Sequence, residues 1–238
     1  MQLAPCFSID AEVTARFPEI KVGAAVIRDV QVVPQHSALE ALKAQVLSEV
    51  RQKLQDTPLA ECTRVQAFRR IYRAFGVNPG SRRPSAEALL RRVLDPTKGL
   101  YQLNTVVDTY NLSSVEHQLP MAAYNLDHIV PPVVLRFAQA GELHRAIGQD
   151  QAEPLTAGEL IYADQRTVLC RDFNYRDADL TKVTLATRHL IVFVDGCEGI
   201  DTNELGTTLQ AVTERIIAFN GGVVQSLGIY PPPEVGSA

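Results

Sequence analysis

The sequence predicts an α+β (mixed α/β) fold, and three observations support this prediction. Helical periodicity dominates residues 37–95, strand-like runs dominate residues 120–194, and one further helical pattern follows residue 201. The chain has 238 residues, of which 46% are hydrophobic and 21% charged, so it can bury a core and resembles ordinary globular proteins in composition. No internal repeat and no linker-like change of composition interrupts it. We therefore expect a single domain over residues 1–238, with a helical N-terminal lobe and a mixed central sheet.

The first elements are a strand and three helices. Residues 20–33 are rich in valine and isoleucine and predict a strand. Ser37 and Glu40 form a capping box before a helix that runs to about residue 55, because apolar residues recur there every three or four positions. The same spacing predicts two further helices, over residues 63–74 and 84–94.

The second half of the chain alternates strands and turns before one late helix. Residues 103–117 have features of both strand and helix, and we expect a mixed strand–helix region there. The predicted strands cover residues 120–127, 133–137, 160–162, 167–170, 189–194 and 223–229. A last helix begins at Asp201, with Glu204 three residues later, and ends at Asn220 before two glycines.

Several kinds of chemistry have no signature in this sequence. It contains no GxxxxGK[ST] phosphate-binding loop, no GxGxxG after a strand and no GxSxG nucleophile elbow. The four cysteines and five histidines are widely spaced, so we expect reduced thiols, no metal and no cofactor. No apolar run approaches the roughly 20 residues that span a bilayer, and no signal peptide is recognisable. The expectation is a cytoplasmic protein without a membrane partner.

Positive charge is concentrated in one segment of an acidic chain. The net charge is −4, but residues 64–92 contain eight arginines and a single acid, Glu87, so they carry +7 and the rest carries −11. Such a patch can neutralise phosphates while the remaining surface stays acidic. The candidate RNA-binding residues are Arg82, Arg83, Arg91, Arg92 and, in a later polar loop, Arg176. The alternative is that the arginines simply solvate two helix faces.

Two polar motifs stand close together in the middle of the chain. Residues 104–111 read Asn-Thr-Val-Val-Asp-Thr-Tyr-Asn, and residues 120–127 read Pro-Met-Ala-Ala-Tyr-Asn-Leu-Asp. Polar groups so close to a core segment must be hydrogen-bonded or line a site. Asn104, Asp108 and Asn111 therefore either contribute to a site or knit a buried turn together.

This pair of motifs resembles the tRNA-binding and editing (B3/B4) domain of the phenylalanyl-tRNA synthetase β subunit. There an Asn-Val-Val-Asp-x-x-Asn run is followed by a Leu-Gly-x-Pro-x-x-x-Phe-Asp run. Further segments are similar to the family in the same order, namely residues 84–93, 135–142, 158–164 and 168–184. The resemblance covers about residues 80–200 and implies a B3/B4-like α+β domain.

The resemblance also implies a partner and an activity. The partner is tRNA with an aminoacylated 3′ end, and no DNA is expected. The activity is metal-free hydrolysis of a wrongly attached amino acid. Because this sequence shows no aminoacylation motif, it would act in trans. Two alternatives stay open: a non-catalytic RNA-binding module, and a small-molecule binding protein that reuses the pocket.

The resemblance finally implies site residues. Hydrolysis of an activated ester needs an oriented water and a stabilised oxyanion, which polar side chains can supply. The predicted catalytic residues are Asn111 and Tyr110, with Asp179 to hold the α-ammonium of the substrate and Asp177 as the near alternative. The predicted substrate-binding residues are Asn104, Thr109, Met121, Ala122, Asp127 and Asp177. Ala122 stands where the family usually has a histidine, which implies either a pocket reshaped for another amino acid or binding without hydrolysis.

Overall fold

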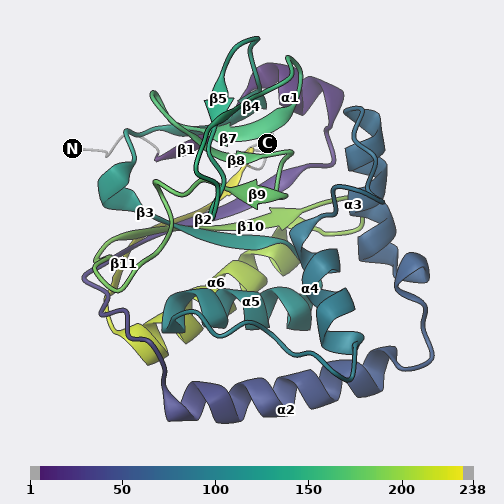
Figure 1. Cartoon of the computed structure of the whole chain (residues 1–238), viewed down its shortest axis with the longest axis vertical. Helices are drawn as coiled ribbons and strands as arrows, with labels where there is room; N and C mark the ends of the chain where they lie inside the picture. Colours follow the sequence, from purple (N-terminus) through teal and green to yellow (C-terminus); the bar gives the residue numbers. More distant parts are fainter. Residues whose placement is uncertain (1–5, 233–238) are drawn as a thin grey trace, which may run out of the picture.

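The computed structural model describes residues 6–232 and arranges them in layers (Figure 1). A four-stranded sheet lies in the middle, a five-stranded sheet covers one face, and α5 and α6 cover the other, with α2 outermost. The α-helices are α1 (Ala11–Arg16), α2 (Ser37–Leu54), α3 (Thr63–Ala74), α4 (Ser85–Leu94), α5 (Thr105–His117) and α6 (Thr202–Asn220). The short 3-10 helices are η1 (Leu59–Glu61) and η2 (Leu126–His128). The predicted mixed α/β class is confirmed.

The four-stranded sheet has the order β11-β2-β10-β3 and is antiparallel throughout. Its strands are β2 (Lys21–Arg28), β3 (Met121–Asn125), β10 (Leu190–Gly196) and β11 (Val223–Tyr230). Every residue of β10 is buried, as expected for an apolar run between two neighbouring strands. Strand β3 forms one edge of this sheet, so its outer side is free to border a site.

The five-stranded sheet has the order β1-β4-β7-β8-β9 and is mixed, because β1 pairs with β4 in parallel and the other pairs are antiparallel. Its strands are β1 (Phe7–Ile9), β4 (Val133–Phe137), β7 (Leu160–Ala163), β8 (Val168–Arg171) and β9 (Arg176–Asp177). The separate hairpin of β5 (Leu143–His144) and β6 (Glu153–Pro154) lies beside it.

Aromatic packing joins the two sheets. The ring of Phe7 on β1 lies 4.9 Å from that of Phe193 on β10, and the ring of Tyr162 on β7 lies 5.0 Å from Phe193, measured between centroids. Such pairs contribute about 0.5–1.5 kcal/mol each beyond the burial of their area. The inner faces of the sheets therefore form one continuous core.

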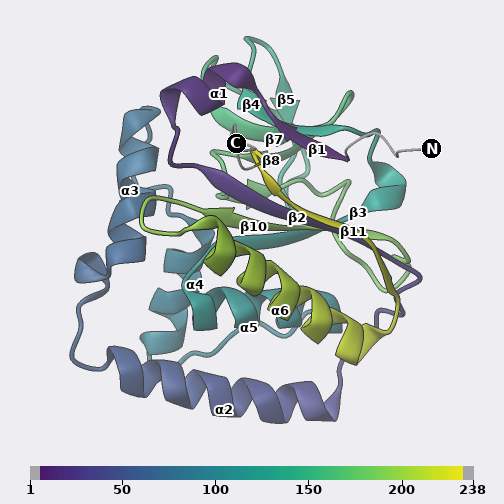
Figure 2. The same ribbon diagram turned by 180° about the vertical axis from the view of Figure 1, so that it is seen from behind.

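Helix α5 is the centre of the helical layer. Figure 2 shows α6 crossing the sheet face beside it, and α2 packs on its far side. Every residue from Thr105 to Val115 is buried. Several of the polar ones have partners: the Thr109 hydroxyl donates to the Thr105 carbonyl (2.6 Å), and the Asp108 carboxylate pairs with Lys43 of α2 (3.0 Å). A helix that is buried all round needs such partners.

Three sequence predictions need correction. Residues 105–117 form one regular helix and not a mixed region, since the Asn104 side chain accepts a hydrogen bond from the Val107 N–H and caps it. The capping box at Ser37 is wrong, because Ser37 is already helical and His36 precedes it without a side-chain cap. The first long strand ends at Arg28, just before Asp29, whose φ is 61°. The cap at Asp201 is confirmed.

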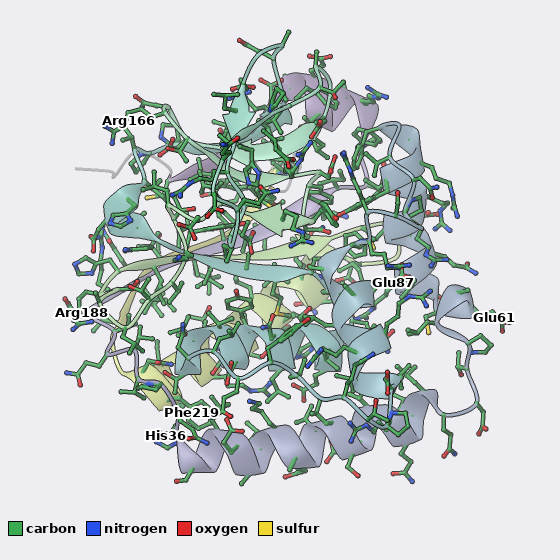
Figure 3. The ribbon with its side chains drawn as sticks, viewed as in Figure 1. His36, Glu61, Glu87, Arg166, Arg188 and Phe219 are labelled. Carbon is green, nitrogen blue, oxygen red and sulfur yellow. The ribbon has the colours of Figure 1, made fainter. Side chains whose placement is uncertain are left out.

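The helices at 37–54, 63–74 and 85–94 match their predictions closely. At the far end of α2, the rings of His36 and Phe219 lie 5.3 Å apart, and Figure 3 shows them side by side. Within residues 6–232, no helix combines the length and apolarity needed to cross a membrane.

Candidate functional site

A pocket of about 720 Å³ lies where α4, α5, β3 and β9 meet. Of the residues predicted for the site, its walls bring together Asn104, Tyr110, Asn111, Met121 and Asp177, with Arg83 and Arg176. Tyrosines at positions 101, 124 and 175 also line it. A site with apolar walls and a few convergent polar groups is typical of ligand binding. The two sequence motifs thus meet in space, because α5 packs against β3.

Tyr110 and Asn111 face this pocket without partners. They are only 8% and 9% exposed, yet neither side chain makes a hydrogen bond to any of residues 6–232. Buried polar groups are normally satisfied, so unsatisfied ones beside a pocket are available to a ligand or to water. Burial, and next the charge of Asp177, raises the pKa of the Tyr110 hydroxyl, which therefore stays protonated as a donor.

Asn104 has a structural role beside them. Its side-chain oxygen caps α5 through the Val107 N–H (3.0 Å), and its amide nitrogen donates to the Val183 carbonyl (3.3 Å). Asp108 likewise accepts from the Leu103 N–H (2.9 Å) in addition to its bond from Lys43. The motif therefore contains both structural residues and residues that line the pocket.

Asp177 is the carboxylate of the pocket. Its Oδ1 accepts a 2.7 Å hydrogen bond from the Tyr124 hydroxyl. Burial raises the pKa of Asp177, and hydrogen bonds from Tyr124 and Cys170 oppose that rise. A carboxylate in such surroundings is a candidate functional group.

Four predicted residues lie elsewhere. Asp179 is outside the pocket lining, and its carboxylate pairs with Lys182 (2.5 Å) and Arg145 (3.2 Å). The Lys182 hydrogen bond lowers the pKa of Asp179. Thr109 is fully buried within α5, and Asp127 is exposed in η2. Ala122 lines a separate enclosed cavity.

Five of the eight arginines of the basic segment, residues 64–92, form ion pairs with acids within residues 6–232. Arg82 pairs with the buried Asp172 (2.9 Å), and Arg69 and Arg91 both pair with Glu87 (2.6 and 2.8 Å), which projects from α4 in Figure 3. Arg92 lies 3.9 Å over the ring of Tyr101. Of the four arginines predicted in this segment, only Arg83 lines the pocket, and it has no acidic partner within residues 6–232.

A second cavity of about 50 Å³, more enclosed than the pocket, adjoins it and shares Ser85, Met121, Tyr124, Tyr175 and Asp177 with it. Its further walls are Ala122, Tyr162, Phe173, Asn174, Phe193 and Asp195.

Asp195 was not predicted from the sequence. It accepts hydrogen bonds from the Tyr162 hydroxyl and from the Asn174 amide (2.9 Å), and burial raises its pKa to about 7. The available signal was a carboxylate directly after the apolar run 190–194.

The loop that brings Tyr175 to both cavities and Asn174 to the enclosed one is strained. Asp172 and Phe173 adopt φ angles of 49° and 65°, the left-handed region that non-glycine residues avoid. Each such residue costs about 1–3 kcal/mol and persists where its surroundings hold it. The ion pair from Arg82 to Asp172 supplies one such restraint.

Comparison with known proteins identifies the family of this chain. No curated protein matches the chain. One solved structure that matches this chain is an N-terminal fragment of the phenylalanyl-tRNA synthetase β subunit from Pyrococcus horikoshii, with 12% sequence identity and a TM-score of 0.48. The match covers 94% of this chain and 54% of that fragment, so the chain spans about half its length. Residues 67–226 match the model of the B3/4 domain, a wider range than the motifs predicted. The chain belongs to the B3/4 domain family.

Proposed function

We propose that this chain, acting as a single domain, binds tRNA and hydrolyses the ester bond of a mischarged aminoacyl-tRNA in the pocket between α5 and β9. The observation that carries the proposal is the pair of nearly buried side chains of Tyr110 and Asn111, which have no hydrogen-bond partner in the described part of the chain and share a pocket with the carboxylate of Asp177. Membership of the B3/4 domain family, a tRNA-synthetase-related domain, supports a tRNA substrate.

The reaction needs little from the protein because the ester is already activated. Water adds to the ester carbonyl carbon, and the bond from that carbon to the ribose oxygen then breaks. The amino acid leaves with a free carboxyl group, and the tRNA regains its hydroxyl. The Asn111 amide and the Tyr110 hydroxyl orient the water and donate hydrogen bonds to the oxyanion that forms.

The remaining groups of the pocket hold the substrate. Asp177 accepts hydrogen bonds from the α-ammonium of the amino acid, taking the role predicted for Asp179, whose carboxylate is held by Lys182 and Arg145. Arg83 and Arg176 lie on exposed parts of the rim and meet the phosphates near the tRNA 3′ end. Tyr101, about half exposed, offers a ring on which an unpaired base can stack.

The test is a deacylation panel. The purified chain is incubated with correctly and incorrectly charged tRNAs, and release of the amino acid is followed over time. Wild-type protein should hydrolyse at least one mischarged tRNA faster than buffer, and Asn111→Ala and Asp177→Asn should lose that activity. Asn203→Ala, an exposed asparagine of α6, is the matched control. Hydrolysis of no charged tRNA would exclude the enzymatic function.

A second candidate is binding without hydrolysis, with either RNA or a small molecule as the ligand. The small-molecule form is favoured by the ion pairs of the basic segment, since five of its eight arginines contact acids: Arg64, Arg69, Arg70, Arg82 and Arg91. The charge left for phosphates is therefore small. Salt-dependent binding of uncharged tRNA, measured beside the panel, separates an RNA-binding protein from one that binds only a small molecule.

A further inference from the structure

We propose, on the basis of the function above, that the enclosed cavity beside Asp177 is a specificity subsite for the side chain of the amino acid. The subsite receives the end of that side chain, and Asp195 selects an end that carries an ammonium group. The favoured substrate is then a tRNA charged with a diamino acid: its α-ammonium binds Asp177 and its side-chain ammonium binds Asp195.

The position of the cavity supports this role. It shares five wall residues with the pocket, among them Asp177, so a group held there continues directly from a substrate in the pocket. Its volume is about 50 Å³, and roughly 10–15 Å³ of such space already holds one water. The cavity therefore has room for the end of a side chain but not for a whole amino acid.

The walls of the cavity define what can enter. The rings of Phe173, Phe193 and Tyr162 suit a methylene chain, whereas Asp177 and Asp195 add two carboxyl groups. The described wall residues include no lysine, arginine or histidine. Asp195 is buried and Asp177 is partly buried. Two such carboxylates without a cation repel each other and are costly to ionise, so an entering ammonium would relieve that cost.

Asp195 retains the capacity to bind such a group. Its two oxygens each accept one hydrogen bond, Oδ1 from Tyr162 and Oδ2 from Asn174. A carboxylate has about four lone-pair positions, so each oxygen can accept another donor. The existing bonds hold the carboxylate in place, and the residue is only 4% exposed. It is therefore a rigid acceptor at the inner end of the site.

Ala122 keeps the cavity open. It contributes a wall from β3, and a methyl side chain there leaves space that a longer side chain would occupy. The position where the family motif usually has a histidine thus becomes, in this chain, part of the side-chain subsite.

The experiment compares tRNAs that carry matched amino acids. Single-turnover hydrolysis is measured with lysine against norleucine, which differ by the terminal ammonium, and with tyrosine against phenylalanine, which differ by a hydroxyl. Lysine should exceed norleucine by at least about 10-fold, because a site that hydrogen-bonds a substrate group rejects analogues lacking it. Asp195→Asn should bring that ratio close to one, whereas Asp150→Asn, an exposed loop residue, should leave it unchanged. Equal rates for lysine and norleucine, or a preference confined to tyrosine, would overturn the proposal.

Two further measurements keep the result interpretable. Ala122→Leu, which fills the cavity from β3, should abolish hydrolysis of the lysine substrate, whereas Asp150→Asn should leave that hydrolysis unchanged. If wild-type protein hydrolyses no tRNA at all, calorimetric binding of lysinamide against norleucinamide tests the subsite by itself. Binding of lysinamide alone, lost in Asp195→Asn, would support the subsite although the hydrolytic function had failed. Binding of neither would overturn both.

Discussion

The Tyr124 hydroxyl donates a 2.7 Å hydrogen bond to Asp177 and thereby ties β3, an edge strand of one sheet, to β9, an edge strand of the other. Both residues line the pocket and the enclosed cavity. The two carboxyls of the site thus each depend on a tyrosine: Asp177 on Tyr124, and Asp195 on Tyr162.

Removing the first of these donors should shift the pH dependence of hydrolysis. In Tyr124→Phe the pKa of Asp177, already raised by burial, loses a hydrogen bond that lowers it and rises further. Because the ionised form binds the α-ammonium, the acidic limb of the kcat/KM profile should move to higher pH. Tyr230→Phe, on β11, is the control, and an unmoved limb would show that Asp177 does not bind the substrate.

Asn111→Ala should affect catalysis far more than stability. The side chain has no hydrogen bond within residues 6–232, so its loss leaves no partner unsatisfied, and the melting temperature should change little. The kcat should fall by about 10²–10³, as for the loss of a donor to an oxyanion. If kcat is retained while KM rises, Asn111 binds substrate but does not stabilise the transition state.

Arg83→Ala should weaken tRNA binding and reduce its salt dependence by about one unit of slope. Arg73→Ala provides the matched comparison, because Arg73 is exposed on α3 but outside the pocket. Affinities measured over a range of salt concentrations should separate the two variants. If both variants weakened tRNA binding equally, the total charge of residues 64–92 would determine the affinity, and the position of Arg83 at the pocket would not.

Asp108→Ala should destabilise the fold by about 3 kcal/mol, since it removes one partner of a buried ion pair and leaves Lys43 with only Glu40. Urea unfolding measures this change. The exposed Glu49→Ala on the same helix as Lys43 should stay within about 0.5 kcal/mol of wild type. If Asp108→Ala also changed the free energy of unfolding by no more than about 0.5 kcal/mol, the ion pair between Asp108 and Lys43 would not stabilise the fold.

Asp195 should make stability depend on pH. Its folded pKa of about 7 lies above the unfolded value of about 3.9, so the folded state binds more protons between these values. The free energy of unfolding should therefore fall as pH rises from about 4 to 7, and Asp195→Asn should remove that component. The titratable groups near Asp195 include Asp177, Tyr72, Tyr162, Cys170 and Cys197. Urea unfolding of wild type and Asp195→Asn at pH 5 and pH 8 tests this pH dependence. If the free energy of unfolding changed equally with pH in both proteins, the prediction would be contradicted.

The sequence predicted the amphipathic elements well and the buried helix poorly. α3 has one apolar face and one arginine-rich face, so its period is visible. α5 is buried on all sides from Thr105 to Val115, so polar and apolar residues there follow no helical period. The Asn104 cap is a local signal for its start, but its packing against α2, α6 and β3 depends on residues far away in the sequence, which local patterns do not contain.

The candidate site shows the same division. Motif resemblance pointed to Tyr110, Asn111 and Met121, which lie in the two runs that carry the resemblance and which line the pocket. It did not locate Asp195 or Tyr162, which reach the cavity from strands far along the chain. The arginines were counted as free charge because their partners, such as Asp172 and Glu198, are distant in sequence.

The contact of Glu87 with Arg69 and Arg91 has a consequence for the evolution of this surface. One carboxylate, 1% exposed, joins two helices and at the same time cancels charge that would otherwise attract phosphates. A single exchange of Glu87 for a neutral residue would release two guanidinium groups beside the pocket helix α4. Stability of the helical lobe and affinity for polyanions are therefore opposed at this one position, and a gain in one is expected to reduce the other.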